Sequence, residues 1–418
     1  MLPLDVVTPT RVANTTTFVD NMRLPVHRWF RYSAGFSADW AASVIEESGA
    51  QRVLDPFGGS GTTVVAAEQV GVAGVGVDVH PFVTRVAKAK LAWRADPDVL
   101  LKRANEVRLE AEKGRPVVEP SAPLIAKCFP DRDALLDLLR VRDAVERLRV
   151  GDDYDELLWL AFVSIIRACS PAGTAQWQYV LPNKTKARVA EPNAAFEARV
   201  EIFAQDMWTM RSHLSAPAGR IVEADARTLD GVEDGWADLI LTSPPYANNF
   251  DYADATRLEQ SFLGEIGGWG DLKPLRKKLM KSATQHMAGW DPAEALESPL
   301  LEPIRDELLG VFNELADVKQ HKGGKKAYDL MVAGYFLDSA QIWQALRRAS
   351  APGVKVCYVV GDSAPYGVHV PVERWLGDLA VAAGFKDWRF KKVRDRNTKW
   401  KNRKHTHPLH EGRLWIEG

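Results

Sequence analysis

The chain contains few of the residues on which disulfide-bonded and metal-binding proteins depend. Its 418 residues include three cysteines, Cys128, Cys169 and Cys357, which lie far apart in the sequence. Their spacing is not that of metal ligands, and three thiols do not build a disulfide framework. We therefore expect a cytoplasmic protein, in a reducing compartment, without a metal site.

The chain also lacks a net charge and any long apolar run. The formal net charge is −1, so nucleic acid would be bound by local basic patches rather than by a field from the whole molecule. No apolar stretch reaches the roughly 18 residues that a membrane-spanning helix needs. The first residues also lack the basic and apolar regions of a signal peptide. We expect no membrane association, and either one large domain with insertions or two domains.

A glycine-rich stretch lies between two predicted strands. The strand Arg52-Val-Leu54 leads into Asp55-Pro-Phe-Gly-Gly-Ser-Gly-Thr-Thr63, and a helix and a second strand ending at Asp78 follow. In α/β folds ligands bind at the carboxyl ends of strands, where glycines let the backbone approach closely. The stretch lacks the Lys-Ser/Thr of a phosphate-binding loop and the spacing Gly-x-Gly-x-x-Gly. An acid at its start and Asp78, which can accept both hydroxyls of a ribose, favour a ligand with an ammonium group and no phosphates. The alternative is a tight turn and a surface acid without chemistry.

A rigid turn follows another predicted strand, in Leu239-Ile-Leu-Thr-Ser-Pro-Pro-Tyr246. Each proline restricts its own φ and removes an N–H donor, so the strand stops there. The turn presents the Ser243 hydroxyl, backbone carbonyls and the ring of Tyr246. This set suits a planar ring with an amino group, although an ordinary strand end would look similar.

Together, the two motifs resemble those of S-adenosylmethionine-dependent amino-methyltransferases of DNA, which modify N4 of cytosine or N6 of adenine. The Ser-Pro-Pro-Tyr form is most often found in the N4-cytosine group. The segment His27-Arg-Trp-Phe-Arg-Tyr with Phe36 is similar to the motif that packs on the methionine part of the cofactor. Asp78 matches the ribose-binding acid of the family, and Asp225 the residue near the adenine amino group. The long block between Asp78 and Asp225 departs from the compact family pattern.

The resemblance implies an α/β fold: a Rossmann-like class I methyltransferase sheet with helical insertions. It implies S-adenosylmethionine as the cofactor, with cofactor-binding residues His27, Phe36, Asp55, Pro56, Phe57, Gly58, Gly59, Ser60, Gly61, Thr62, Asp78, Val79, Asp225 and Ala226. The catalytic residues would be Ser243, Pro244, Pro245 and Tyr246.

The expected division of the chain has five parts. These are an N-terminal arm with the cofactor-binding half of the domain (1–94), a helical insertion (95–215), a catalytic half (216–264), a basic insertion that is a candidate for target recognition (265–327), and the rest of the sheet with a basic C-terminal tail (328–418).

The chemistry of methyl transfer to an amine agrees with these residues. An exocyclic amine is a poor nucleophile because its lone pair is delocalised into the ring. The Ser243 hydroxyl and a main-chain carbonyl at Pro244 could accept its hydrogens, and transfer is then mainly a matter of positioning and electrostatics. The base would have to be flipped out of double-stranded DNA, and Tyr246 would stack on it.

Basic clusters with interleaved aromatic residues are the candidates for contact with phosphates. A charged, solvated surface is the alternative. The selected residues are Lys277, Lys278, Lys325, Arg394, Arg396, Lys399, Lys401 and Arg403.

Several functions stay open at this point. Site-specific methylation of cytosine N4 is preferred, followed by methylation of adenine N6 and then of a base in RNA. A cofactor-binding component of a defence system without turnover is the non-enzymatic alternative. No nuclease constellation is apparent in the sequence, so a cognate restriction nuclease would be a separate protein.

Overall fold

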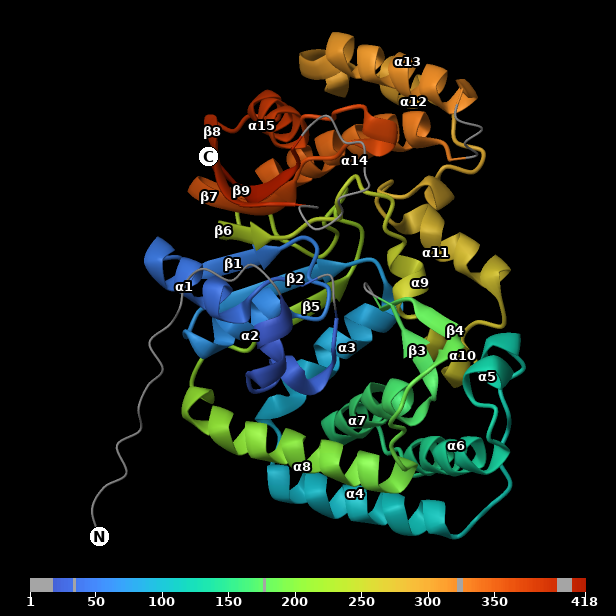
Figure 1. The fold of residues 1–418 in the computed structure, drawn as a ribbon. Coiled ribbons are helices and arrows are strands. Elements are labelled where there is room, and N and C mark those ends of the chain that lie inside the picture. Colours follow the sequence, from blue (N-terminus) through green and yellow to red (C-terminus); the bar gives the residue numbers. More distant parts are fainter. Residues whose placement is uncertain (1–17, 33–34, 176–177, 322–325, 397–407) are drawn as a thin grey trace.

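The computed structural model describes residues 18–32, 35–175, 178–321, 326–396 and 408–418 (Figure 1). Four of the basic residues selected from the sequence, Lys325, Lys399, Lys401 and Arg403, lie outside these ranges. In the described ranges, no helix is long and apolar enough to cross a membrane. The three cysteines are buried and unpaired.

The strands of the main sheet are β1 Arg52–Asp55, β2 Ala73–Asp78, β5 Arg220–Glu223, β6 Ala237–Thr242, β7 Ser350–Gly361, β8 Asp387–Asp395 and β9 His410–Glu417. A separate hairpin consists of β3 Ala172–Thr174 and β4 Val180–Thr185.

The α-helices are α1 Ala38–Ser48, α2 Thr62–Gln69, α3 Pro81–Leu91, α4 Pro97–Glu112, α5 Pro123–Cys128, α6 Arg132–Arg147, α7 Asp153–Cys169, α8 Pro192–Met210, α9 Tyr252–Ala255, α10 Arg257–Leu263, α11 Lys273–Lys278, α12 Ala293–Leu296, α13 Arg305–His321, α14 Tyr328–Ala349 and α15 Val372–Ala382.

Within the described residues, seven strands form one sheet in the order β5-β2-β1-β6-β7-β9-β8. The pairs from β5 to β7 are parallel, whereas β9 is antiparallel to both of its neighbours. The chain runs outward from β1 through β2 to β5 on one side and from β6 to β7 on the other. This topology confirms the predicted α/β, Rossmann-like methyltransferase fold. It also predicts a ligand site at the carboxyl ends of β1 and β6, where the strand order reverses.

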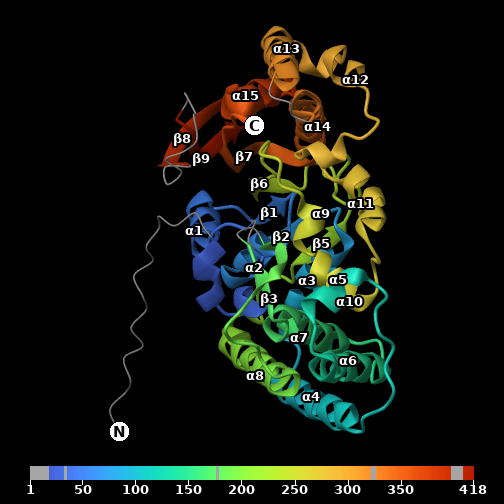
Figure 2. The same cartoon turned by 45° about the vertical axis from the view of Figure 1, so that its right-hand side comes forward.

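Helices cover both faces of the sheet, because alternate strand residues point to opposite sides. Val53 and Leu239 pack on one face with residues of α1 and α2. Leu54 and Ile240, one position further along each strand, pack on the other face with α14 and α15. Figures 1 and 2 show these helices on the two sides of the central strands.

The chain between β2 and β5 forms a helical bundle below the sheet in Figure 1. Helices α4, α6, α7 and α8 contact one another there and share one apolar core with α3. The N-terminal segment is fastened to this bundle: Trp29 stacks on Phe203 with ring centroids 4.2 Å apart. The buried Asp206 carboxylate accepts hydrogen bonds from the Trp29 Nε1, Arg28 and the Val26 backbone N–H.

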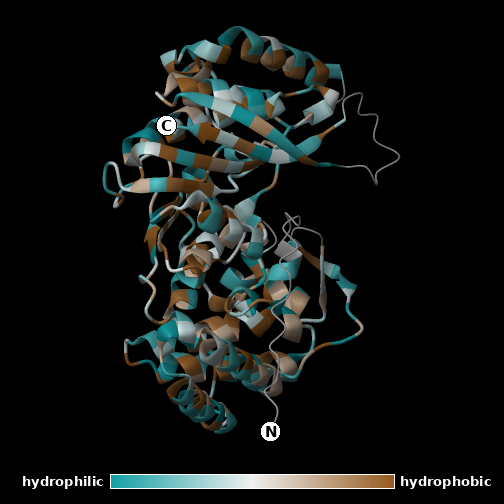
Figure 3. Ribbon diagram, turned by 90° about the vertical axis from the view of Figure 1, so that its left-hand side faces the viewer, coloured by the Kyte–Doolittle hydropathy of each residue, from teal (hydrophilic) through white to brown (hydrophobic). Residues whose placement is uncertain are grey.

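Strand β9 is an element that the sequence pattern does not predict, because its residues follow the segment interpreted above as a basic tail. It inserts between β7 and β8, and its Leu414 and Ile416 side chains are buried. Hydrophilic and hydrophobic residues alternate along the strands near the C-terminus in Figure 3, as expected for strands with one covered face.

Candidate active site

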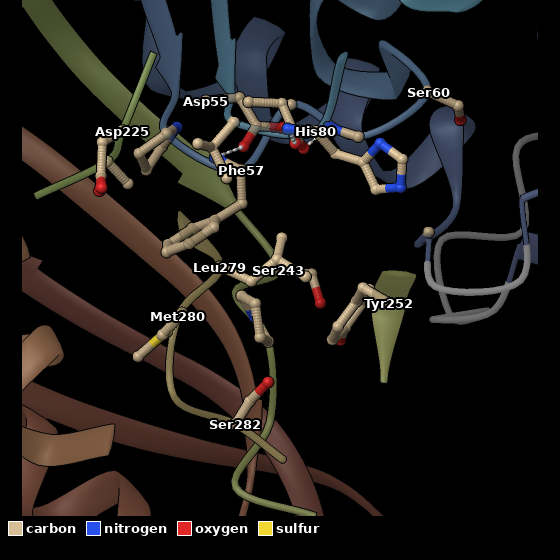
Figure 4. Close-up of a pocket in the computed structure, with 18 of the residues that line it drawn as sticks. Asp55, Phe57, Ser60, His80, Asp225, Ser243, Tyr252, Leu279, Met280 and Ser282 are labelled. Carbon is tan, nitrogen blue, oxygen red and sulfur yellow. Dashed lines mark hydrogen bonds between the residues drawn. The ribbon is translucent and has the colours of Figure 1, made fainter. Parts of the chain in front are cut away.

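A pocket lies at the carboxyl ends of β1, β2 and β6. The glycine loop after β1 forms one wall, and the turn after β6 contributes Ser243 and Pro245 to another (Figure 4). The two motifs meet because β1 and β6 are paired neighbours, with Val53 opposite Leu239. The predicted residues that line the pocket are Phe36, Asp55, Pro56, Phe57, Gly58, Gly59, Ser60, Thr62, Asp78, Val79, Asp225, Ala226, Ser243 and Pro245.

The lining does not include the predicted residues His27, Gly61, Pro244 and Tyr246. His27 is fully buried, and its backbone carbonyl accepts a hydrogen bond from the Lys90 Nζ at 3.3 Å. Burial, together with the nearby Lys90, lowers the pKa of His27 to about 3. Gly61 is the N-cap of α2, with φ 83°, and Pro244 lines a small neighbouring cavity with Phe57.

Other lining residues were not predicted for the cofactor or for catalysis: Tyr32, Gly35, His80, Arg227, Tyr252, Lys278, Leu279, Met280, Ser282 and Ile342. Tyr32 belongs to the segment that resembles the methionine-side motif. The residues from Leu279 to Ser282 follow a basic helix and carry no motif, so no signal in the sequence places them here.

Asp55 ties the ends of β1 and β6 together. Its Oδ1 accepts hydrogen bonds from the Thr242 hydroxyl at 2.5 Å and the Phe57 N–H at 3.0 Å, and its Oδ2 from the Thr63 hydroxyl at 2.5 Å. Burial raises the pKa of Asp55 to about 6, although the hydrogen bonds from Thr242, Thr63 and Phe57 oppose this shift. Because Thr242 directly precedes Ser243, the Asp55 carboxylate also fixes where the turn after β6 begins.

Asp78 holds the glycine loop against the end of β2. Its two carboxylate oxygens accept hydrogen bonds from the backbone N–H groups of Gly59 and His80, each at 2.9 Å. Burial raises the pKa of Asp78 above its usual value. Each oxygen keeps a second lone pair, which can accept a hydroxyl of a ribose.

Close packing demands glycine in two places of the loop. A Cβ at position 58 would lie 3.3 Å from the Gly76 Cα, and one at position 59 would lie 3.2 Å from the Tyr32 ring. Gly59 also has φ 49°, a conformation that residues with a side chain rarely adopt. The loop can therefore lie tightly between β2 and the Tyr32 side chain.

Asp225 is engaged by a neighbouring arginine. Arg227 donates from its Nε to both Asp225 oxygens, at 2.9 and 3.0 Å, and from its Nη1 to Asp338 at 3.1 Å. Its Nη2 also donates to the backbone carbonyl of Lys278 at 2.8 Å. Arg227 thus connects the segment after β5 to α14 and to the end of α11.

These residues fit the S-adenosylmethionine that the resemblance implies. Phe57, Val79 and Ile342 offer apolar surface to a planar ring system, and Asp78 offers acceptors to a ribose. The Ser60 hydroxyl lines the pocket and is buried, and none of the described residues forms a hydrogen bond with it, so a polar group of a ligand could be its partner.

The turn after β6 is held by contacts from other elements. The Ser243 Oγ lies 3.5 Å from the Val359 carbonyl, to which it can donate. The Tyr335 hydroxyl donates to the Pro245 carbonyl at 3.0 Å. The Tyr246 ring is covered by Arg396, whose guanidinium carbon lies 5.2 Å from the ring centroid.

The described basic residues differ in their surroundings. Arg396 donates from Nη1 to the Asp362 carbonyl at 2.9 Å and lies over the Tyr246 ring, beside the turn after β6. Arg394 pairs with Glu411 at 2.8 Å. Lys277 and Lys278 are exposed at the end of α11, next to the pocket. Among the described side chains, no group of three or more His, Cys, Asp or Glu residues could hold a metal ion.

Comparison with known proteins found relatives over most of the chain. No protein-family model matches it. The chain is 24% identical over 420 residues to the Type II methyltransferase M.BsoBI of Geobacillus stearothermophilus, which covers 88% of this chain and 80% of that protein. It is 22% identical to M.AvaI of Nostoc, with 88% and 81% covered, and 20% identical to M.MvaI of Kocuria varians, with 86% and 82% covered. Over most of its length and not only in its two motifs, the chain is therefore similar in sequence to Type II methyltransferases.

Proposed function

We propose that the chain is a site-specific DNA methyltransferase that transfers a methyl group from S-adenosylmethionine to the exocyclic amine of a flipped base, preferably N4 of cytosine. The observation that carries the proposal is one pocket with two chemically different walls. The glycine loop and Asp78 suit the cofactor, and Ser243 and Pro245 face the same space. S-adenosylmethionine is the methyl donor of Type II DNA methyltransferases, the class of the relatives described above.

The residues of the chain would act mainly by positioning. When bound, S-adenosylmethionine supplies an electrophilic methyl group on a sulfonium. Ser243 would accept one hydrogen of the target amine, which withdraws the amine lone pair from the ring. Since the Pro245 carbonyl already accepts the Tyr335 hydroxyl, we assign the second hydrogen to the Pro244 carbonyl. The amine nitrogen would form the bond to the methyl carbon in line with the breaking sulfur–carbon bond, without a covalent enzyme intermediate. S-adenosylhomocysteine would leave as the neutral thioether, and the methylated amine would lose one proton to water.

The base must leave the duplex to reach this pocket, and Tyr246 is the proposed stacking surface. Arg396 covers that ring in the free protein. Stacking of a base on Tyr246 would therefore displace Arg396 or enclose the base between the ring and the guanidinium. Lys277 and Lys278 would contact the DNA backbone near the pocket mouth.

The preference for cytosine depends on the serine at the head of the turn, which is the form most often found in the N4-cytosine group. Methylation of adenine N6 is the second candidate, because its amine is flanked by a ring nitrogen in the same way. Methylation of RNA and binding without turnover are the remaining alternatives. In a restriction-modification system, the cognate nuclease would be a separate protein.

One experiment separates these functions. The purified protein is incubated with S-adenosylmethionine labelled in its methyl group and with unmethylated duplex DNA or tRNA, and the nucleosides are then analysed. We expect label in DNA as N4-methylcytosine. N6-methyladenine would support the second candidate, label only in tRNA would support RNA methylation, and no transfer to any substrate would refute the enzymatic proposal.

A further inference from the structure

A second buried hydroxyl without a partner lines the pocket, at Ser282. The residue is 1% exposed, and its Oγ has no hydrogen-bond partner among the residues that the structure describes. An unpaired buried hydroxyl destabilises a protein, so a ligand that pairs with it offers a physical explanation. The residue lies in the segment after α11, which carries none of the motifs that point to the pocket.

Ser282 is held in place by Asn249, which lies in the loop that follows the turn at Ser243. The Asn249 N–H donates to the Ser282 carbonyl at 3.0 Å. The Asn249 Oδ1 accepts hydrogen bonds from the Thr284 N–H at 2.9 Å and from its hydroxyl at 2.7 Å. Asn249 adopts φ 66°, which is unfavourable for a residue with a side chain and is compensated by these three bonds.

Two buried ion pairs fasten the same segment on either side. Arg276 in α11 pairs with Asp251 at 2.6 Å. Lys281, the residue before Ser282, pairs with Asp338 at 2.8 Å through its Nζ and at 2.9 Å through its backbone N–H. Ser282 is therefore a fixed part of the pocket wall.

The position of Ser282 indicates which ligand it meets. Figure 4 shows it on the side of Ser243 and away from Asp55 and Ser60, with its hydroxyl turned toward the space between Ser243 and Tyr252. The cofactor side has its own unpaired hydroxyl, that of Ser60. The base side is thus the side that Ser282 can serve.

We propose that Ser282 is a specificity-determining residue that donates a hydrogen bond to the ring nitrogen next to the target amine. The inference rests on the proposed function. The amines of cytosine and adenine are both flanked by a ring nitrogen that accepts hydrogen bonds. In thymine and guanine the corresponding positions are a carbonyl and an N–H. Ser243 as acceptor and Ser282 as donor would therefore favour the two amino bases and disfavour the two keto bases.

The test is Ser282→Ala, which removes only the hydroxyl. Because that hydroxyl has no partner in the described part of the chain, we expect the melting temperature to be unchanged or slightly raised. With the target site mapped by sequencing of methylated DNA, we expect kcat/KM on a duplex with that site to fall about 10- to 100-fold, the usual effect of one unpaired group at a specificity site.

A binding measurement identifies the ligand of Ser282. On a duplex that is abasic at the target position, the variant and the wild type should bind equally, whereas on the intact site the variant should bind more weakly. The affinity for S-adenosylhomocysteine should not change. The matched control is Ser60→Ala, which removes the other unpaired hydroxyl and should weaken S-adenosylhomocysteine binding without altering the comparison between the two duplexes.

The outcomes separate the inference from the proposed function. If the wild type methylates DNA and Ser282→Ala matches it in kcat/KM, the role of Ser282 is refuted and the function stands. If Ser282→Ala weakens S-adenosylhomocysteine binding instead, the hydroxyl serves the cofactor and the inference is wrong. If the wild type transfers no methyl group to DNA, the function fails and the inference fails with it.

Discussion

The substitution Thr242→Val tests how the two halves of the site are joined. Valine has the shape of threonine, so the change removes the hydroxyl that donates to the Asp55 carboxylate at 2.5 Å and little else. A hydrogen bond to a buried charged group contributes about 1.5–3 kcal/mol to stability. Because the entropy of unfolding grows with chain length, a loss of about 2 kcal/mol in the free energy of unfolding lowers the melting temperature of a 418-residue chain by roughly 2 °C.

The loss should depend on pH, and its sign follows from the pKa of Asp55. That pKa is raised to about 6 in the folded protein, against about 3.9 in an unfolded chain. The contribution of Asp55 to stability is therefore most favourable below pH 4 and is lost as the pH rises through 6. Removing one donor raises the folded pKa further, since the carboxylate loses a group that stabilises its charge. The variant should thus lose most stability at pH 8.5, where Asp55 is ionised, and less at pH 5.

Calorimetric melting at pH 5 and pH 8.5 measures this difference. The matched control is Thr84→Val: the Thr84 side chain is also buried, but its hydroxyl donates to the neutral backbone carbonyl of Asp78 at 3.1 Å. Its effect should be the same at both pH values. An effect of Thr242→Val that is equal at the two pH values, or equal to that of the control, would refute the assigned role of Asp55.

Four further substitutions test other parts of the site. Ser243→Ala should lower the turnover number about tenfold, because one of the two hydrogen-bond acceptors for the target amine is lost. Tyr246→Ala should lower it 100-fold or more, because the surface on which the base stacks is lost. Equal and negligible effects of the two substitutions on turnover would contradict the proposed pocket. Asp78→Asn should weaken S-adenosylhomocysteine binding by about 10- to 100-fold in calorimetric titration, because the amide replaces one acceptor oxygen by a donor. An unchanged affinity would exclude a role of Asp78 in binding the ribose. Arg276→Met should lower stability by about 3 kcal/mol in thermal melts, since the buried Asp251 carboxylate loses its guanidinium partner and keeps only the His286 Nε2 nearby, at 3.6 Å. The double variant with Asp251→Asn should recover part of the loss.

Local features of the sequence were sufficient to predict much of the fold. A serine before a helical stretch is a typical N-cap, and the Ser37 side chain accepts a hydrogen bond from the Trp40 N–H at the start of α1. Helices α7 and α14 are each an amphipathic or apolar stretch between polar ends, a pattern that specifies a helix from short-range information. The glycine loop was also predictable, since its glycines are required by backbone geometry within a few residues.

Long-range pairing decided what the sequence pattern did not reveal. Strand β9 lies between β7 and β8 because its partners Tyr358 and Phe390, opposite Leu414, are available only in the folded sheet. Ser282 reaches the pocket because Asn249 and Asp338, both distant in sequence, hold its segment there.

The sequence by itself therefore determined the strands that carry the two motifs, the glycine loop and the turn at Ser243, each from residues that are adjacent in the chain. Only the tertiary structure decided that Asp55 bonds to Thr242, that Arg396 covers Tyr246 and that Ser282 faces the pocket. The reason is physical: hydrogen bonds and ring contacts form between groups that folding brings within a few ångströms, whatever their separation along the chain.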